Sequence, residues 1–134
     1  MMAIFDTGVW VALIDRSEDH HEACVEWLKG YRGRLFSTEA VLTEVLYLLD
    51  FSIKAQSAAI DFIMKSVVEI IPASNESVKR SMELMEKYSD LPMDYADATL
   101  VCLAMDLGIT DVATLDRRDF SVYRVGKRRF NIVP

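Results

Sequence analysis

The sequence predicts an α/β protein, a three-layer α/β/α sandwich in which helices cover both faces of a parallel sheet. Short apolar segments alternate with longer segments whose apolar residues recur at helical spacing. The 134-residue chain is 51% hydrophobic and 27% charged, with only five Gly and three Pro, which is typical of a chain that builds one core. We therefore expect residues 1–134 to form a single domain.

The first two elements are predicted because the spacing of apolar residues changes from a strand pattern to a helix pattern at Asp6. Residues 2–5 are short and apolar, which predicts a buried strand, and the apolar pattern then continues as a helix directly after Asp6. A second helix opens at Ser17 or Asp19, both of which are good cap residues, and it ends at the glycines 30 and 33.

The same alternation continues after these glycines. Residues 34–37 predict a second strand. Ser37 or Thr38 then caps a strongly apolar helix over residues 39–51. A more polar helix follows from Lys54.

A third strand is predicted at residues 67–71, which are mostly β-branched and stop at Pro72. Ser74 starts an amphipathic helix that continues to Tyr88. Both faces of the sheet thereby receive helices.

The last third of the chain begins with a helix over residues 94–107, which Gly108 terminates. Residues 111–115 predict a strand, and residues 130–133 predict a final strand at the C-terminus.

Several protein classes are excluded by composition. The longest uninterrupted apolar runs have six residues, whereas a membrane span needs about 20, so no membrane association is expected. The N-terminus has no signal-peptide pattern, which makes the cytoplasm the expected location. Cys24 and Cys102 lie among apolar residues and are too few for a disulfide framework or a zinc site.

Two aspartates stand where predicted strands end. Asp6 follows the first strand and Asp116 follows the strand at 111–115, and open α/β sheets bind ligands at the carboxyl ends of their strands. Each has a structural alternative, because an aspartate between a strand and a helix is also a good N-cap. Taken alone, Asp6 fits the cap.

Glu44 is the most informative acid. Its neighbours one turn away in the predicted helix are Ala40, Val41, Tyr47 and Leu48, all largely apolar. A carboxylate on a buried helix face is costly unless it is paired or binds a metal, and no basic residue lies within one turn. Either a distant cation reaches Glu44 or it faces a shared polar cleft, and we favour the cleft.

Asp94 and Asp97 have the spacing of a capping pair at the start of a helix. This structural role explains Asp94. Asp97 lies closer to the apolar stripe of the same helix, so we expect it to point toward the same place as Glu44.

Convergence of Asp6, Glu44, Asp97 and Asp116 would create strong mutual repulsion, which hard divalent cations with oxygen ligands relieve. Two Mg²⁺ or Mn²⁺ ions about 3.5–4 Å apart activate a water and stabilise both oxygens of an in-line displacement at phosphorus. The reaction that this arrangement predicts is phosphodiester hydrolysis.

The sequence also resembles a known family. Four segments carry the resemblance: Asp6-Thr7-Gly8-Val9-Trp10-Val11-Ala12-Leu13, Thr43-Glu44-Val45, Asp94-Tyr95-Ala96-Asp97-Ala98 and Thr114-Leu115-Asp116-Arg117-Arg118-Asp119-Phe120. In this order they are similar to PIN-domain ribonucleases, and most similar to the VapC-type toxins of type II toxin-antitoxin systems.

The resemblance implies a parallel five-stranded sheet and cleavage of single-stranded RNA with Mg²⁺ or Mn²⁺ held by Asp6, Glu44, Asp97 and Asp116. Thr7 and Thr114 match hydroxyl positions that orient metal ligands or water, and Asp94 and Asp119 are further acids with auxiliary roles. A homodimer and a small antitoxin protein, with a segment lying across the acidic cleft, are the implied partners.

Charge is distributed unevenly along the chain. The net charge is −6, yet residues 117–134 contain six Lys or Arg and one acid. A basic run is often only a solvated surface, but beside a ribonuclease site it offers RNA contacts. The candidates are Arg117, Arg118, Lys127 and Arg128.

Two alternatives belong to other function classes. A binding or regulatory module would keep the PIN-like fold and sequester a partner without turnover. A phosphoryl-transfer receiver or phosphatase would carry paired acids after the first strand and a partner lysine late in the chain. Asp6-Thr7-Gly8 has no second acid, and Lys127 lies beyond the last motif.

Overall fold

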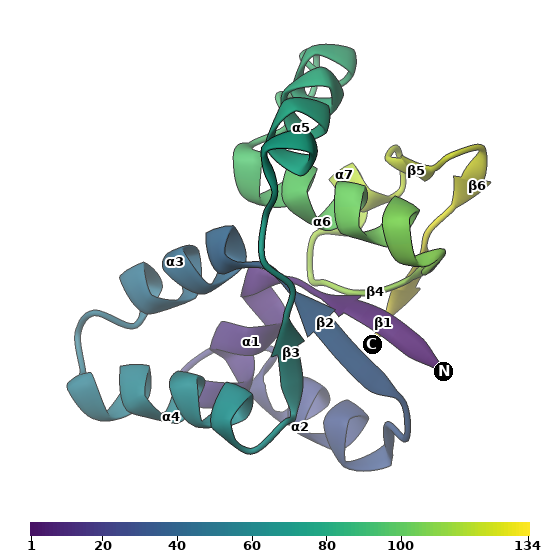
Figure 1. Cartoon of the computed structure of the whole chain (residues 1–134). Coiled ribbons are helices and arrows are strands. Elements are labelled where there is room, and N and C mark those ends of the chain that lie inside the picture. Colours follow the sequence, from purple (N-terminus) through teal and green to yellow (C-terminus); the bar gives the residue numbers. More distant parts are fainter.

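A computed structural model describes residues 1–134 and has helices on both sides of a central sheet (Figure 1). The strands are β1 Met2–Phe5, β2 Arg34–Ser37, β3 Val68–Ile70, β4 Asp111–Ala113, β5 Arg124–Val125, β6 Arg128–Arg129 and β7 Asn131–Val133. The helices are α1 Thr7–Ile14, α2 His21–Gly30, α3 Glu39–Leu48, α4 Ile53–Met64, α5 Asn75–Lys87, α6 Tyr95–Leu107 and α7 Arg117–Phe120. All five predicted strands are present.

The main sheet is parallel and has the strand order β3-β2-β1-β4-β7. Ala3 in the central strand β1 lies opposite Leu35 of β2 on one side and Asp111 of β4 on the other. The chain moves outward from β1 to β3 and then returns to the opposite side of β1. The carboxyl ends of β1 and β4 are therefore neighbours at the point where the strand order reverses.

Helices cover both faces of this sheet, which confirms the predicted three-layer sandwich. Figure 1 shows α1, α2 and α4 on one face and α5 and α6 on the other. On the first face, α1 packs against α2, α3 and α4, and the fully buried Trp10 lies against Phe5 with ring centroids 5.4 Å apart. On the second face, α6 packs against α5 and α3.

Helix α6 is buried along most of its length and has a defined start and end. The Asp94 carboxylate accepts a hydrogen bond from the Asp97 backbone N–H at 2.8 Å, which caps the first turn as the sequence predicts. Gly108 ends the helix in the left-handed conformation, with φ of 67°, which glycine adopts at low cost. Residues of this helix thus have fixed positions relative to the sheet.

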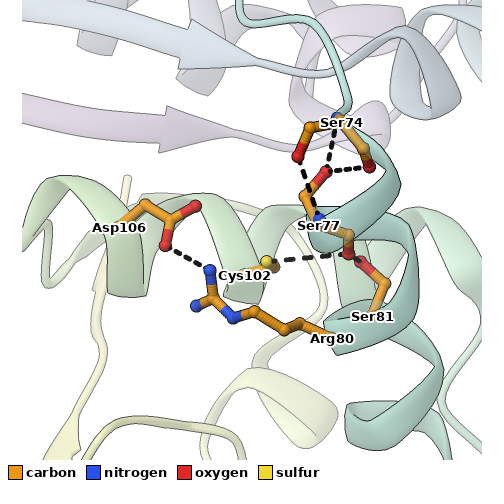
Figure 2. Close-up of polar contacts among 6 residues, drawn as sticks. All are labelled: Ser74, Ser77, Arg80, Ser81, Cys102 and Asp106. Atoms are coloured by element: carbon orange, nitrogen blue, oxygen red, sulfur yellow. Dashed lines mark hydrogen bonds and ion pairs between the residues drawn. The ribbon is translucent and has the colours of Figure 1, made fainter.

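Helix α5 is fastened to α6 by polar contacts (Figure 2). Ser74 and Ser77 form a reciprocal capping box at its start. Arg80 pairs with Asp106 of α6 at 2.6 Å, and the Cys102 thiol lies 3.9 Å from the Ser77 carbonyl oxygen. Both Cys102 and Cys24 are buried and free, as expected from their apolar neighbours.

The chain beyond β4 differs most from the predicted elements. The single turn α7 and the antiparallel hairpin of β5 and β6 were not predicted. They lack the repeated apolar pattern that identifies longer elements. Helix α3 also ends at Leu48 rather than at residue 51, and α2 begins at His21. No helix of this structure has the length and apolar character required to cross a bilayer.

Candidate active site

The site begins where β1 and β4 end. Asp6 follows β1 at the carboxyl end of the strand and is the N-cap of α1, which confirms the predicted capping role. Its Oδ1 accepts from the Thr7 N–H at 2.8 Å, and its Oδ2 accepts from the Thr114 hydroxyl at 2.7 Å. Burial raises the pKa of Asp6 to about 6, although these hydrogen bonds oppose the shift.

Thr7 connects Glu44 to Asp6, because it donates a hydrogen bond to each of them. The Thr7 hydroxyl donates to Glu44 Oε1 at 2.7 Å. The apolar neighbours placed Glu44 on a buried helix face, but Tyr47 and Leu48 are exposed, and Glu44 is half-buried at the edge of the α3 core stripe. A hydroxyl, rather than a cation, is therefore its partner in the structure.

Asp97, Asp116 and Asp119 form a close carboxylate cluster. One oxygen from each lies within 4.8 Å of the others, which is close enough for a shared metal ion. Asp116 caps α7 by accepting from the Asp119 N–H at 3.0 Å, and this cap brings the two side chains together. Asp119, expected only as an auxiliary acid, thus belongs to this cluster, whereas Glu44 and the more deeply buried Asp6 do not.

Asp97 has the most perturbed carboxyl group. Its pKa is raised to about 8, first by burial and then by repulsion from Asp6, Asp94 and Asp116. The Tyr123 hydroxyl donates to Asp97 Oδ2 at 3.1 Å and opposes the rise. The sequence around Tyr123 gives no sign of this contact, because no local motif connects it to a helix residue 26 positions earlier.

The two predicted hydroxyl groups and Asp94 have distinct positions. Thr7 and Thr114 each donate to an acid, and Thr114 also accepts from the Asp116 N–H at 3.0 Å. Asp94 is exposed, and one of its oxygens is occupied in capping α6. The structure therefore places Asp94 at the helix start and outside the carboxylate cluster.

No acid of the site forms an ion pair with a Lys or Arg side chain. The three ion pairs of the structure are Lys29–Glu26, Arg34–Glu69 and Arg80–Asp106, and all lie outside the site. Close carboxylates that lack a balancing cation suit a divalent metal ion, since their donor set consists of oxygen atoms only. The residues present therefore fit Mg²⁺ or Mn²⁺.

The four predicted basic residues are exposed. Arg117 and Arg118 follow Asp116 directly, and Lys127 and Arg128 lie in the β5–β6 hairpin. Arg117 donates to the carbonyl oxygen of Pro134 at 2.7 Å, whereas the other three make no side-chain hydrogen bond. Arg117 and Arg118 thus place positive charge next to Asp116 in the chain.

Comparison with known proteins identifies relatives across nearly the whole chain. The PIN domain family model matches residues 3–126. Ribonuclease VapC26 of Mycobacterium tuberculosis is 28% identical over 134 residues, which cover 98% of this chain and 99% of that protein.

Solved structures with a similar fold include two proteins of toxin systems. The structure of M. tuberculosis VapC20, described as a toxin that cleaves the sarcin-ricin loop, has a TM-score of 0.80 and 19% identity over 88% of this chain and 92% of that chain. A toxin-antitoxin complex from Klebsiella pneumoniae has a TM-score of 0.66 and 19% identity over 98% and 96%. These likenesses support the fold.

The raised pKa of Asp97 predicts a pH-dependent stability in the absence of metal. The pKa of about 8 in the folded protein exceeds the ordinary aspartate pKa of 3.8, so ionisation of Asp97 lowers the free energy of unfolding progressively as pH rises between these two values. In EDTA, Asp97→Asn should raise the free energy of unfolding by about 1–3 kcal/mol at about pH 8 and by less at about pH 5. Urea denaturation at both pH values measures this difference.

Asp106→Asn is the matched control, because Asp106 lies on the same helix and is paired with Arg80. That variant should shift stability equally at both pH values. An identical pH dependence in wild type and Asp97→Asn would contradict the proposed destabilisation by Asp97.

Proposed function

Since the chain belongs to the PIN domain family, we propose that it is a metal-dependent endoribonuclease that hydrolyses phosphodiester bonds of single-stranded RNA. The observation that carries this proposal is the cluster of Asp97, Asp116 and Asp119, to which Asp6 lies close and in which no acid forms an ion pair. The names of VapC26 and VapC20 support RNA as the substrate. An enzyme of this kind acts on RNA in the cytoplasm.

The metal site that we propose is built from Asp97, Asp116 and Asp119, with Asp6 and Glu44 at its edge. These carboxylates would hold Mg²⁺ or Mn²⁺, and the ion would supply a water of lowered pKa and stabilise charge on the phosphate. Asp97 must lose its proton to bind a metal ion, so its raised pKa makes metal affinity increase with pH.

The remaining groups of the site orient these ligands or contact RNA. Thr7 and Thr114 hold Glu44 and Asp6 by hydrogen bonds, which fixes the direction of their free lone pairs. The exposed side chains of Arg117, Arg118, Lys127 and Arg128 contact the RNA backbone and offset its repulsion by the acids.

A small antitoxin is proposed as an inhibitory partner. An apolar surface follows Glu44 in the chain. Tyr47 and Leu48 at the end of α3 are 72% and 51% exposed, Phe51 in the following loop is 66% exposed, and Ile53 at the start of α4 is 78% exposed. Its position, starting one turn after Glu44, lets one segment cover both this surface and the acids. The toxin-antitoxin complex with a similar fold supports this type of partner.

A second copy of this chain is the other proposed partner. Val78 and Met82 are exposed on one face of α5, while Ser77 and Ser81 of the same helix face α6. Apolar side chains one turn apart form a stripe that a second α5 would cover.

RNA cleavage tests the proposed activity. The purified protein, freed of antitoxin, should cleave members of a single-stranded RNA panel with Mg²⁺ or Mn²⁺ and should be inactive in EDTA. Asp97→Asn should lower the rate by at least about 100-fold, because a metal ligand is lost, whereas Asp106→Asn should retain nearly full activity. Metal-dependent cleavage that survives Asp97→Asn would contradict the proposal.

Antitoxin inhibition tests the apolar surface. Phe51→Ser with Ile53→Ser should weaken inhibition by the co-purified antitoxin by about 10-fold or more, because both side chains lose buried contact area. Cleavage without antitoxin should not change. Met105→Ser removes an exposed apolar residue of α6 as a control, and equal inhibition of all three proteins would exclude this surface.

Oligomeric state tests the second surface. Light scattering should give twice the chain mass of 15.2 kDa for wild type, as for a dimer, and the mass of one chain for Met82→Glu. Met64→Glu, at an exposed residue of α4, should remain dimeric. A monomeric wild type at micromolar concentration would contradict the proposed dimer.

A further inference from the structure

Tyr123 is a completely buried residue between α7 and β5 whose hydroxyl reaches the acids. It donates to Asp97 Oδ2 at 3.1 Å. No other hydrogen bond is made to this carboxylate, and Asp97 Oδ1 accepts none. One oxygen is thus occupied by a protein donor, and the other remains available.

The ring of Tyr123 is fixed by aromatic neighbours. Phe120 and Tyr88 pack against it in edge-to-face geometry, with ring centroids 5.1 Å and 5.0 Å away. Its backbone N–H donates to the carbonyl oxygen of Asp119 at 3.1 Å. Tyr123 therefore connects Asp97 of α6 to Asp119 of α7, two residues of the carboxylate cluster that come from different elements.

This connection opposes an electrostatic tendency of the site. Asp97 is repelled by Asp6, Asp94 and Asp116. Rotation of a half-buried aspartate toward solvent would relieve that repulsion and move its carboxylate away from Asp116 and Asp119. A fixed phenol that donates to Oδ2 stabilises the inward rotamer.

We propose that Tyr123 is a positioning residue that holds the Asp97 carboxylate facing Asp116 and Asp119, so that these acids are arranged for a divalent cation before it binds. The inference rests on the proposed metal site. Tyr123 touches neither substrate nor metal and acts only through Asp97. Its effect is therefore on metal affinity first.

Tyr88 provides a matched control because it is a buried tyrosine of the same aromatic cluster. Its hydroxyl accepts from the Arg124 backbone N–H at 3.1 Å and does not contact the acids. Tyr88→Phe and Tyr123→Phe each remove one buried hydroxyl and keep the ring. A purely structural role predicts similar behaviour of the two variants.

Mn²⁺ binding, followed by electron paramagnetic resonance of the free ion, tests this inference without RNA. Tyr123→Phe should weaken Mn²⁺ binding by about 10-fold, as is common for groups that orient metal ligands. Tyr88→Phe should bind like wild type. Adding Tyr123→Phe to Asp97→Asn should cause no further loss, because the hydroxyl acts through Asp97.

The outcomes separate the inference from the proposed function. Wild-type Mn²⁺ affinity in Tyr123→Phe, with binding weakened in Asp97→Asn, would overturn the role of Tyr123 and leave the metal site intact. Equal weakening in Tyr88→Phe and Tyr123→Phe would also overturn it, as a general packing effect. Absence of Mn²⁺ binding in wild type would overturn both. Thermal unfolding in EDTA confirms that each variant is folded.

Discussion

Repulsion among carboxylates is the constraint on which the organisation of this site depends. Carboxylate oxygens of Asp97, Asp116 and Asp119 lie within 4.8 Å of one another, and Asp6 is close enough to raise the pKa of Asp97 further. Such a group would spread apart if its side chains were free to turn. Four of the acids are held by a donor: Asp6 and Asp116 by a backbone N–H, Asp6 and Glu44 by a threonine hydroxyl, and Asp97 by the buried phenol of Tyr123.

The parallel sheet makes this concentration of charge possible. Because β1 and β4 are adjacent and parallel, Asp6 and Asp116 follow neighbouring strand ends, and Thr114 bridges them by bonding to both residues. Helix α6 adds Asp97 from the layer above. The helix cannot shift easily, since it is buried along most of its length and has a defined cap at each end.

The sequence was sufficient for elements with a strong period. Strands at the sheet centre and the helix over residues 94–107 are continuous apolar patterns, and the capping role of Asp94 follows from its spacing to Asp97. Asp6 and Asp116 could be placed together because strand ends share one edge of a parallel sheet. The apolar neighbours of Cys24 and Cys102 in the sequence correctly predicted that both are core residues.

Features set by tertiary contact could not be predicted in this way. Asp119 joins the cluster only because one turn of helix follows Asp116, and such a short helix has no period. Tyr123 reaches Asp97 through packing of the C-terminal segment on α6. Glu44 was placed on a buried face because its neighbours are apolar, whereas Tyr47 and Leu48 face outward on a surface that this chain does not cover.

The most direct test of this arrangement is the position of a bound ion. A crystal of the protein soaked in Mn²⁺ and measured at the manganese absorption edge should show an anomalous peak among Asp97, Asp116 and Asp119, on the side of Asp6. A peak elsewhere on the surface, or none beside these acids in a crystal soaked at saturating Mn²⁺, would contradict a metal site built on their mutual repulsion.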